Sequence, residues 1–107
     1  MFKICILGSG SMGTALAHLI GNNGHQVVIW GIDQEASEHI NAHHENKKSL
    51  PGVLLNKNVS ANLILPLALV DASVVIVALP AQAVGQVMPA LHNHMAEGAV
   101  ILSVSKG

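Results

Sequence analysis

The sequence predicts an α/β fold built on a doubly wound, mainly parallel β-sheet. Short apolar runs of about five residues, bounded by turn residues, are typical of strands buried on both faces of a sheet. Segments with apolar residues at helical spacing alternate with these runs, as they do in βαβ units. A glycine-rich loop with the spacing G-x-G-x-x-G follows the first run and opens the first helical segment. Together with the chain length, these features indicate one domain that spans residues 1–107.

The first third of the chain contains a complete βαβ unit. An isoleucine-rich run predicts a strand at Lys3–Leu7, and an alanine-rich segment with helical spacing predicts a helix at Ser11–Asn22. The run QVVIW predicts a second strand at Gln26–Trp30. Asp33 then stands where it can cap a helix that extends from about residue 34 to residue 44. This order predicts a right-handed crossover between two parallel strands.

The rest of the chain continues the alternation less regularly. Residues 45–63 are rich in asparagine, with one proline and one glycine, which predicts a loop with at most one short strand. Pro66 suits the first turn of a short helix. Pro89 is expected to kink the last helix or to mark a restart within it. The elements predicted here are a helix at 65–72, a strand at 73–80, a helix at 81–95 and a strand at 99–105.

The composition excludes several classes of function. Of the 107 residues only 10% are charged, none is arginine, and the formal net charge is −1. Since a nucleic-acid-binding surface needs a basic patch or stacking aromatic residues, and only Phe2 and Trp30 are aromatic, this class of partner is not expected. Cys5 is the only cysteine, so no disulfide forms within the chain and we expect a reducing, cytoplasmic location. No apolar stretch reaches the roughly 18 residues of a membrane span, and the N-terminus lacks the pattern of a signal peptide.

Each glycine of the loop has a physical role in binding a dinucleotide. Gly8 allows a tight turn, Gly10 lets the backbone approach a pyrophosphate, and Gly13 lets the helix pack closely against the strand. The N-terminus of the helix presents free N–H groups and about half a positive charge to the pyrophosphate, and Ser11 adds a hydroxyl. The loop therefore predicts a Rossmann-type fold with a dinucleotide site. The alternative is a glycine turn that binds nothing.

The position that distinguishes NAD from NADP lies at the end of the second strand, about 20 residues after the glycine loop. A carboxylate there binds the ribose hydroxyls of NAD, whereas a nearby arginine accommodates the 2′-phosphate of NADP. Asp33 is the only acid near this position in the sequence, and neither arginine nor lysine stands beside it. Two roles stay open for Asp33, ribose binding and capping of the following helix.

Four segments carry a resemblance to a known family: ILGSGSMGTALAHLIGNNGHQVVIWGID, HENKKSLPGVLLNKNV, VVIVALPAQAVGQVM and ILSVSKG. They follow one another with ordinary spacings over essentially the whole chain. The most specific motifs are G-T-A-L-A after the glycine loop, N-G-H before the second strand, Asn46 followed by L-P-G, and the terminal S-K-G. On these residues the chain resembles the N-terminal domain of NAD(P)-dependent glycerol-3-phosphate dehydrogenases of the bacterial type.

The resemblance implies an oxidoreductase that interconverts dihydroxyacetone phosphate and sn-glycerol 3-phosphate for phospholipid synthesis. It implies NAD or NADP as the cofactor, and a homodimer is possible for the full-length enzyme. Lys106, in the S-K-G motif, is implied to reach both cofactor and substrate. An ammonium suits that place because it can neutralise a phosphate and polarise a carbonyl oxygen. The residues that the resemblance implies to bind the cofactor are Gly8, Gly10, Ser11, Met12, Gly13, Ile32, Pro80 and Lys106. Asp33 is added to them from its position at the end of the second strand.

The chain departs from the family pattern at several positions. Met12 and Ser49 stand where an aromatic residue is usual, and Ala81 replaces the usual serine after Pro80. Ile32 stands where a basic residue is common, so NAD is expected to be at least tolerated. The family's second, mostly helical domain, which carries the general acid–base lysine, is absent from these 107 residues. We therefore expect no catalytic residue here, and we interpret the chain as a truncated or fragmentary enzyme that binds cofactor without turnover.

Two other classes of function stay open from the sequence. One is a different Rossmann dehydrogenase of the hydroxyacid or ketopantoate type, against which the Asn46 and S-K-G motifs speak. The other is a non-catalytic nucleotide-binding module.

Several remaining polar residues have a simpler interpretation than a functional one. His39 and His43, four residues apart on a predicted helix and next to His44, have the spacing of a zinc-binding pair, but no convincing further ligand is evident and no metal is expected. Lys47 and Lys48 are expected to be solvated loop charges.

Overall fold

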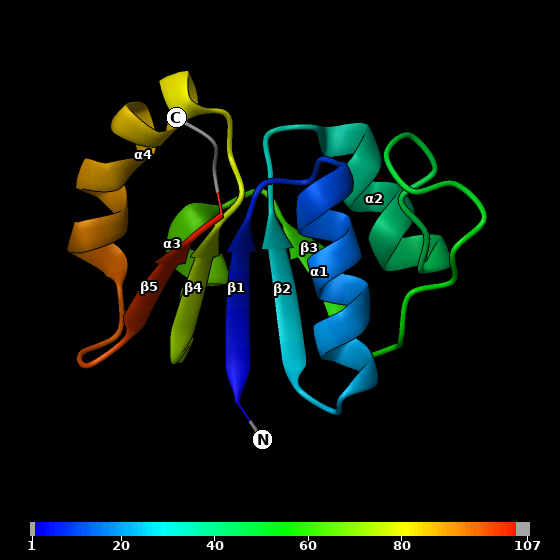
Figure 1. The fold of residues 1–107 in the computed structure, drawn as a ribbon, viewed down its shortest axis with the longest axis horizontal. Coiled ribbons are helices and arrows are strands. Elements are labelled where there is room, and N and C mark those ends of the chain that lie inside the picture. The colour runs from blue at the N-terminus through cyan, green and yellow to red at the C-terminus, as the bar shows by residue number, and fades with distance from the viewer. Residues whose placement is uncertain (1, 105–107) are drawn as a thin grey trace.

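A computed structural model describes residues 2–104, and in this part of the chain five parallel strands form one sheet with helices on both faces (Figure 1). The strand order is β3-β2-β1-β4-β5. The strands are β1 (Lys3–Leu7), β2 (Gln26–Trp30), β3 (Val59–Asn62), β4 (Val74–Val77) and β5 (Val100–Ser103). The helices are α1 (Ser11–Asn22), α2 (Gln34–His43), α3 (Leu65–Ala68) and α4 (Ala81–His94).

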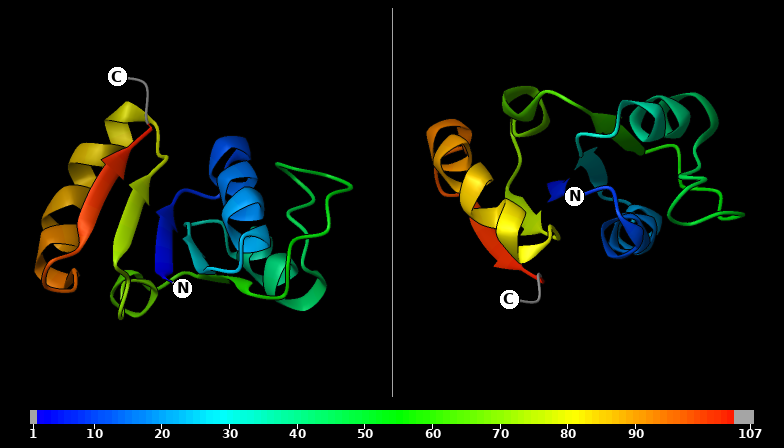
Figure 2. Two further views of the ribbon diagram at one scale, coloured as in Figure 1. Left: turned by 60° about the horizontal axis from the view of Figure 1, so that its bottom comes forward. Right: turned by 90° about the horizontal axis from the view of Figure 1, so that it is seen from above.

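Different helices cover the two faces of the sheet. Alternate residues of a strand point to opposite faces, so the apolar strands have side chains to bury on both. Ile6 of β1 packs with Ala17 of α1 and Ile40 of α2 on one face. Leu7 packs with Leu91 of α4 on the other face, together with the apolar side of α3. Figure 2 shows α1 and α2 to one side of the sheet and α3 and α4 to the other. The predicted doubly wound α/β fold with strands buried on both faces is therefore confirmed.

The direction in which successive strands are added to the sheet reverses between β1 and β4. The chain runs from β1 through β2 to β3 and then crosses back to place β4 on the other side of β1. The register pairs Leu7 at the end of β1 with Val77 at the end of β4. The loops that leave these two neighbouring ends diverge to opposite faces of the sheet. Open α/β sheets bind their ligands at such a point.

The elements of the first third of the chain agree with the prediction. The bounds of β1, α1 and β2 are those expected from the local patterns. Asp33 is the N-cap of α2, as one of its two expected roles requires. The helix ends at His43, one residue early, because His44 adopts a left-handed conformation with φ 56° and caps it.

Later elements differ from the prediction in two instructive ways. β4 ends at Val77 because residues 78–80 leave the sheet and Pro80 becomes the N-cap of α4. α4 continues through Pro89, so the restart predicted there is wrong. Pro89 cannot donate to the carbonyl oxygen of Gly85 one turn earlier. Both residues are exposed, so water can take the place of the missing N–H and the helix tolerates the proline.

The single cysteine of the chain lies in the core of the fold. Cys5 is fully buried in the core, and this burial raises the pKa of its thiol to about 12. The thiol is therefore protonated and structural, as its apolar run predicts. In the part of the chain that the structure describes, no helix is long and apolar enough to cross a membrane.

Candidate dinucleotide-binding site

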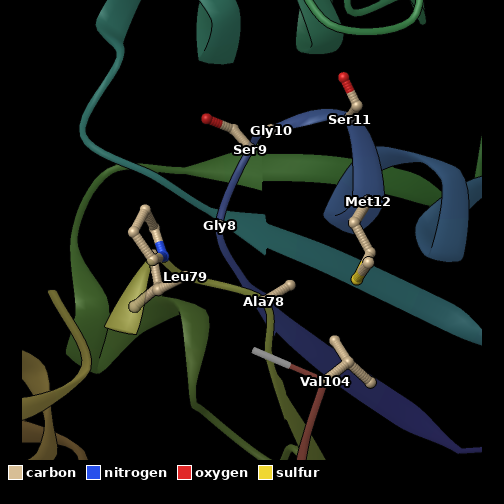
Figure 3. Close-up of a pocket in the computed structure, with 9 residues that line it drawn as sticks. Gly8, Ser9, Gly10, Ser11, Met12, Ala78, Leu79 and Val104 are labelled. Atoms are coloured by element: carbon tan, nitrogen blue, oxygen red, sulfur yellow. The ribbon is translucent and has the colours of Figure 1, made fainter. Parts of the chain in front are cut away.

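A cleft of about 460 Å³ opens where β1 and β4 end. The glycine loop between β1 and α1 forms one wall, and residues 78–80 after β4 form the other (Figure 3). Figure 3 also shows the hydroxyls of Ser9 and Ser11 directed away from Ala78. The residues that line the cleft are Gly8, Ser9, Gly10, Ser11, Met12, Ala78, Leu79, Pro80 and Val104. The cleft thus occupies the place in the sheet where a ligand is expected.

Two of the three loop glycines are required by close packing. A Cβ atom on Gly13 would lie 2.2 Å from the carbonyl oxygen of Gly8, so α1 can approach the loop this closely only without a side chain there. Gly8 has φ +123°, and a Cβ atom on it would lie 2.5 Å from the carbonyl oxygen of Ala78. These contacts agree with the predicted roles of Gly8 in the turn and Gly13 in helix packing.

Gly10 has surroundings that suit an anion rather than a packing contact. It is the N-cap of α1, its helix end has no side-chain cap, and a Cβ atom on it would meet no atom within 4 Å. The first N–H groups of α1 therefore open onto the cleft with the positive end of the helix dipole. The oxygens of a pyrophosphate are ligands that such a helix end binds.

A buried asparagine from the loop after α2 holds the glycine loop in shape. Asn46 is fully buried, and its Nδ2 donates to the carbonyl oxygen of Ser9 at 2.8 Å and to Thr14 Oγ1 at 2.9 Å. In the same region the Ser11 hydroxyl donates to the carbonyl oxygen of Ser49 at 3.0 Å. Because the Asn46 amide engages the Ser9 carbonyl, that oxygen is held inside the protein and away from an anion on the loop.

A second hollow of about 270 Å³ adjoins the cleft at the end of β2. Ser9 lines both hollows, and Trp30, Ile32 and Pro80 form part of the second one. A Cβ atom on Gly31 would lie 2.6 Å from Ser9 Oγ, so the end of β2 is in direct contact with the glycine loop. The apolar walls of this hollow suit an adenine ring attached to a pyrophosphate on the loop.

Asp33 caps α2 and also forms an ion pair. Its Oδ1 accepts from the N–H of Ala36 at 3.1 Å, and its Oδ2 lies 3.1 Å from Lys48 Nζ. The Ala36 N–H, followed by the Lys48 ammonium, holds the pKa of Asp33 below its ordinary value, so the side chain is a carboxylate at neutral pH. Lys48 is half-exposed and paired with Asp33, whereas the sequence predicted only a solvated loop charge. Of the two roles open for Asp33, the helix cap is confirmed.

The structure brings together most of the residues expected to bind the cofactor. Those that line the main cleft or the adjoining hollow are Gly8, Gly10, Ser11, Met12, Ile32 and Pro80. Gly13 packs against the back of the loop, and Asp33 lines neither of these two hollows. Lys106 lies outside the described residues.

Two residues next to the site have contacts that the sequence did not indicate: Asn46 binds Ser9 of the glycine loop, and Lys48 binds Asp33 after β2. Asn46 stood out only within a family motif, and Lys48 only as a loop charge. Their partners Ser9 and Asp33 lie 37 and 15 positions earlier. No helical or strand period connects residues at such separations, so no local pattern in the sequence reveals these contacts.

Of the two histidines of α2, His39 lies near a carboxylate and His43 lies against the ring of His39. The ring centroids of His39 and His43 lie 4.6 Å apart, and His39 Nε2 lies 3.7 Å from Glu45 Oε1. Among the described residues, no group of three or more histidine, cysteine, aspartate or glutamate side chains is placed to hold a metal ion.

A parallel sheet of this order, with a glycine loop and an uncapped helix N-terminus at its switch point, defines a Rossmann-type dinucleotide-binding domain. The family model described as the NAD-dependent glycerol-3-phosphate dehydrogenase N-terminus matches residues 3–107. The chain therefore belongs to the family of N-terminal domains of NAD-dependent glycerol-3-phosphate dehydrogenases, as the sequence motifs indicate.

Relatives of known name and structure agree with this assignment. A glycerol-3-phosphate dehydrogenase [NAD(P)+] of Bacillus licheniformis is 44% identical over 107 residues, which are 100% of this chain and 31% of the relative. The crystal structure of a glycerol-3-phosphate dehydrogenase from Coxiella burnetii matches 99% of this chain and 33% of that one, with a TM-score of 0.93 and 25% identity. The structure of the Plasmodium falciparum glycerol-3-phosphate dehydrogenase matches 99% of this chain and 32% of that one, with a TM-score of 0.89 and 32% identity. The chain thus spans about a third of the length of the curated relatives it matches.

Proposed function

We propose that this chain binds NAD or NADP with the pyrophosphate on the glycine loop. The observation that carries the proposal is the uncapped N-terminus of α1 at Gly10, which opens onto the main cleft. The residues present fit the group, because no side chain occupies the space above Gly10 and the Ser9 carbonyl is held away by Asn46. The adenosine would lie in the adjoining hollow beside Trp30 and Ile32. The [NAD(P)+] in the relatives' names supports this class of cofactor.

For the whole protein we propose the activity that those relatives' names give, glycerol-3-phosphate dehydrogenase. In the reaction that we propose, a hydride passes between the nicotinamide and the carbonyl carbon of dihydroxyacetone phosphate to form glycerol 3-phosphate. Among the described residues that line the cleft, none has a side chain that titrates near neutral pH. As the family resemblance implies, we propose that the proton comes from a lysine of the family's second, mostly helical domain. Lys106 is proposed to contact cofactor and substrate. A cytoplasmic location, supported by the lone buried Cys5, and a homodimer of the full-length enzyme belong to the same proposal.

Titration of the chain with NADH is expected to quench the emission of Trp30, the only tryptophan, in a saturable way. Trp30 lines the hollow beside the glycine loop, so bound adenosine changes its surroundings. Fluorescence titrations with NADH and NADPH measure the two affinities separately. Nicotinamide mononucleotide, which lacks the adenosine, serves as the matched control and should leave the emission unchanged. Absence of any response to either dinucleotide from the folded chain would contradict the proposal.

The chain is expected not to turn over substrate, because its described cleft residues include no proton donor near neutral pH. Dihydroxyacetone phosphate and NADH are mixed with the chain, and NADH oxidation is followed by absorbance. The expected rate equals that of a protein-free blank. Oxidation in proportion to chain concentration would show that these 107 residues contain the general acid and would overturn this part of the proposal.

A further inference from the structure

The loop after α2 brings a lysine to the carboxylate at the end of β2. Lys48 Nζ lies 3.1 Å from Asp33 Oδ2 and 3.4 Å from Glu35 Oε2. The Lys48 side chain is 51% exposed, so its ammonium is accessible to a bound molecule as well as to these carboxylates. Lys48 and Glu35 border a hollow of about 350 Å³, whose other lining residues are Ala36, His39, Asn46 and Lys47.

The position of Asp33 corresponds to the ribose end of a dinucleotide. It follows the end of β2 and stands 20 residues after Gly13 (33 minus 13), where Rossmann domains bind the 2′ substituent of the adenosine ribose. The contact between Gly31 and Ser9 places this end of β2 directly beside the glycine loop. A dinucleotide that runs from the loop across Gly31 therefore brings its ribose toward Asp33 and Lys48.

The carboxylate of Asp33 is already engaged on both oxygens. Oδ1 accepts from the Ala36 N–H and Oδ2 pairs with Lys48, so ribose hydroxyls that bind this carboxylate share its oxygens with these two donors. A carboxylate at this position also repels a 2′-phosphate. Lys48 offsets the repulsion between Asp33 and a 2′-phosphate, because its ammonium is a compact positive charge on a flexible stem. Such a group binds phosphate without the fixed planar geometry that arginine requires.

We propose that Lys48 is a specificity residue for the ribose 2′ position, which neutralises Asp33 and donates to the 2′-phosphate of NADP. The site then accepts NADP as well as NAD, although no basic residue stands next to Asp33 in the sequence. This inference rests on the proposed function, since it requires that the dinucleotide lies on the glycine loop. It adds to that function a residue that discriminates between the two cofactors.

The test compares NADH and NADPH affinities of the wild-type chain and Lys48→Gln by calorimetric titration. Glutamine keeps most of the side-chain length and removes the charge. NADPH binding is expected to weaken about five- to tenfold, and NADH binding less than about twofold. Lys57→Gln, which removes an exposed lysine from the loop before β3, is the matched control and should change neither affinity.

A reciprocal variant separates charge from helix capping. Asparagine is also a good N-cap, so Asp33→Asn keeps α2 capped while it removes the carboxylate that repels phosphate. This variant is expected to bind NADPH several-fold more tightly than wild type. Equal changes in both affinities for Lys48→Gln, or none, would overturn the role of Lys48. A wild-type chain that binds NADH but not NADPH would overturn this inference alone, whereas one that binds neither would overturn the proposed function with it.

Discussion

Gly13→Ala is expected to weaken NADH binding by at least about tenfold and to lower the free energy of unfolding by about 1–3 kcal/mol. The added methyl group would lie 2.2 Å from the carbonyl oxygen of Gly8 and 3.2 Å from its carbonyl carbon. Since both are backbone atoms, no side chain can move aside, and α1 must shift away from the loop. The shift separates the helix N-terminus from the turn at Gly8, so the two parts no longer bind one pyrophosphate. Urea denaturation and NADH titration measure the two effects.

Gly85→Ala is the matched control for this substitution. Gly85 is exposed on α4, and a Cβ atom there would meet nothing within 4 Å. Alanine in a helix interior is favoured over glycine by about 0.5–1 kcal/mol, so this variant should be slightly more stable than wild type and bind NADH equally well. A Gly13→Ala variant with unchanged NADH affinity would show that the close approach of α1 to the loop is not needed for binding.

Asn46→Asp is expected to destabilise the chain by about 2–4 kcal/mol and to weaken NADH binding of the folded fraction by at least about tenfold. Aspartate cannot donate to the Ser9 carbonyl, so two oxygens would face each other where a 2.8 Å hydrogen bond now stands. The buried carboxylate also has no cation among the contacts of Asn46. The Ser9 carbonyl then keeps only the longer hydrogen bond from Thr14 Oγ1, at 3.3 Å, and can turn toward the cleft, where it repels phosphate. Binding is measured at low temperature, where the variant is folded.

Asn41→Ala distinguishes a positioning role of Asn46 from a merely structural one. Asn41 makes two 2.8 Å hydrogen bonds to the backbone of Ala61 in β3, away from the cleft. Its loss should cost about 1–2 kcal/mol of stability and leave NADH affinity unchanged. If Asn46→Asp likewise lost stability but kept its affinity for NADH, Asn46 would support the fold without shaping the glycine loop.

Much of the fold follows from local patterns in the chain. β1, α1 and β2 have the predicted bounds because strand and helix periods are clear there and turn residues separate them. The glycine loop was predictable in the same way, since a buried strand precedes it and an alanine-rich helix follows it. Local patterns predict less well where the effect of a residue depends on its exposure in the folded chain, as the helix-breaking effect of proline does. Pro89 does not interrupt α4, because Gly85, whose carbonyl loses its helical donor there, is an exposed residue at which water can donate instead.

The amino-acid sequence thus specified the type and order of the elements and the glycine loop, because these features depend on residues within one or two turns of one another. The parallel α/β sheet was predictable only from the alternation of strands and helices along the chain. Three features of the site are evident only in the tertiary structure. They are the wall of the cleft formed by residues 78–80, the hydrogen bond from Asn46 to the Ser9 carbonyl, and the ion pair of Lys48 with Asp33. These contacts join segments that are distant in the chain and become neighbours only when β4 lies beside β1 and the loop after α2 folds over the glycine loop. Local periodicity carries no information about such neighbours, so the positions of residues 78–80, Asn46 and Lys48 beside the glycine loop and Asp33 could be found only from the tertiary structure.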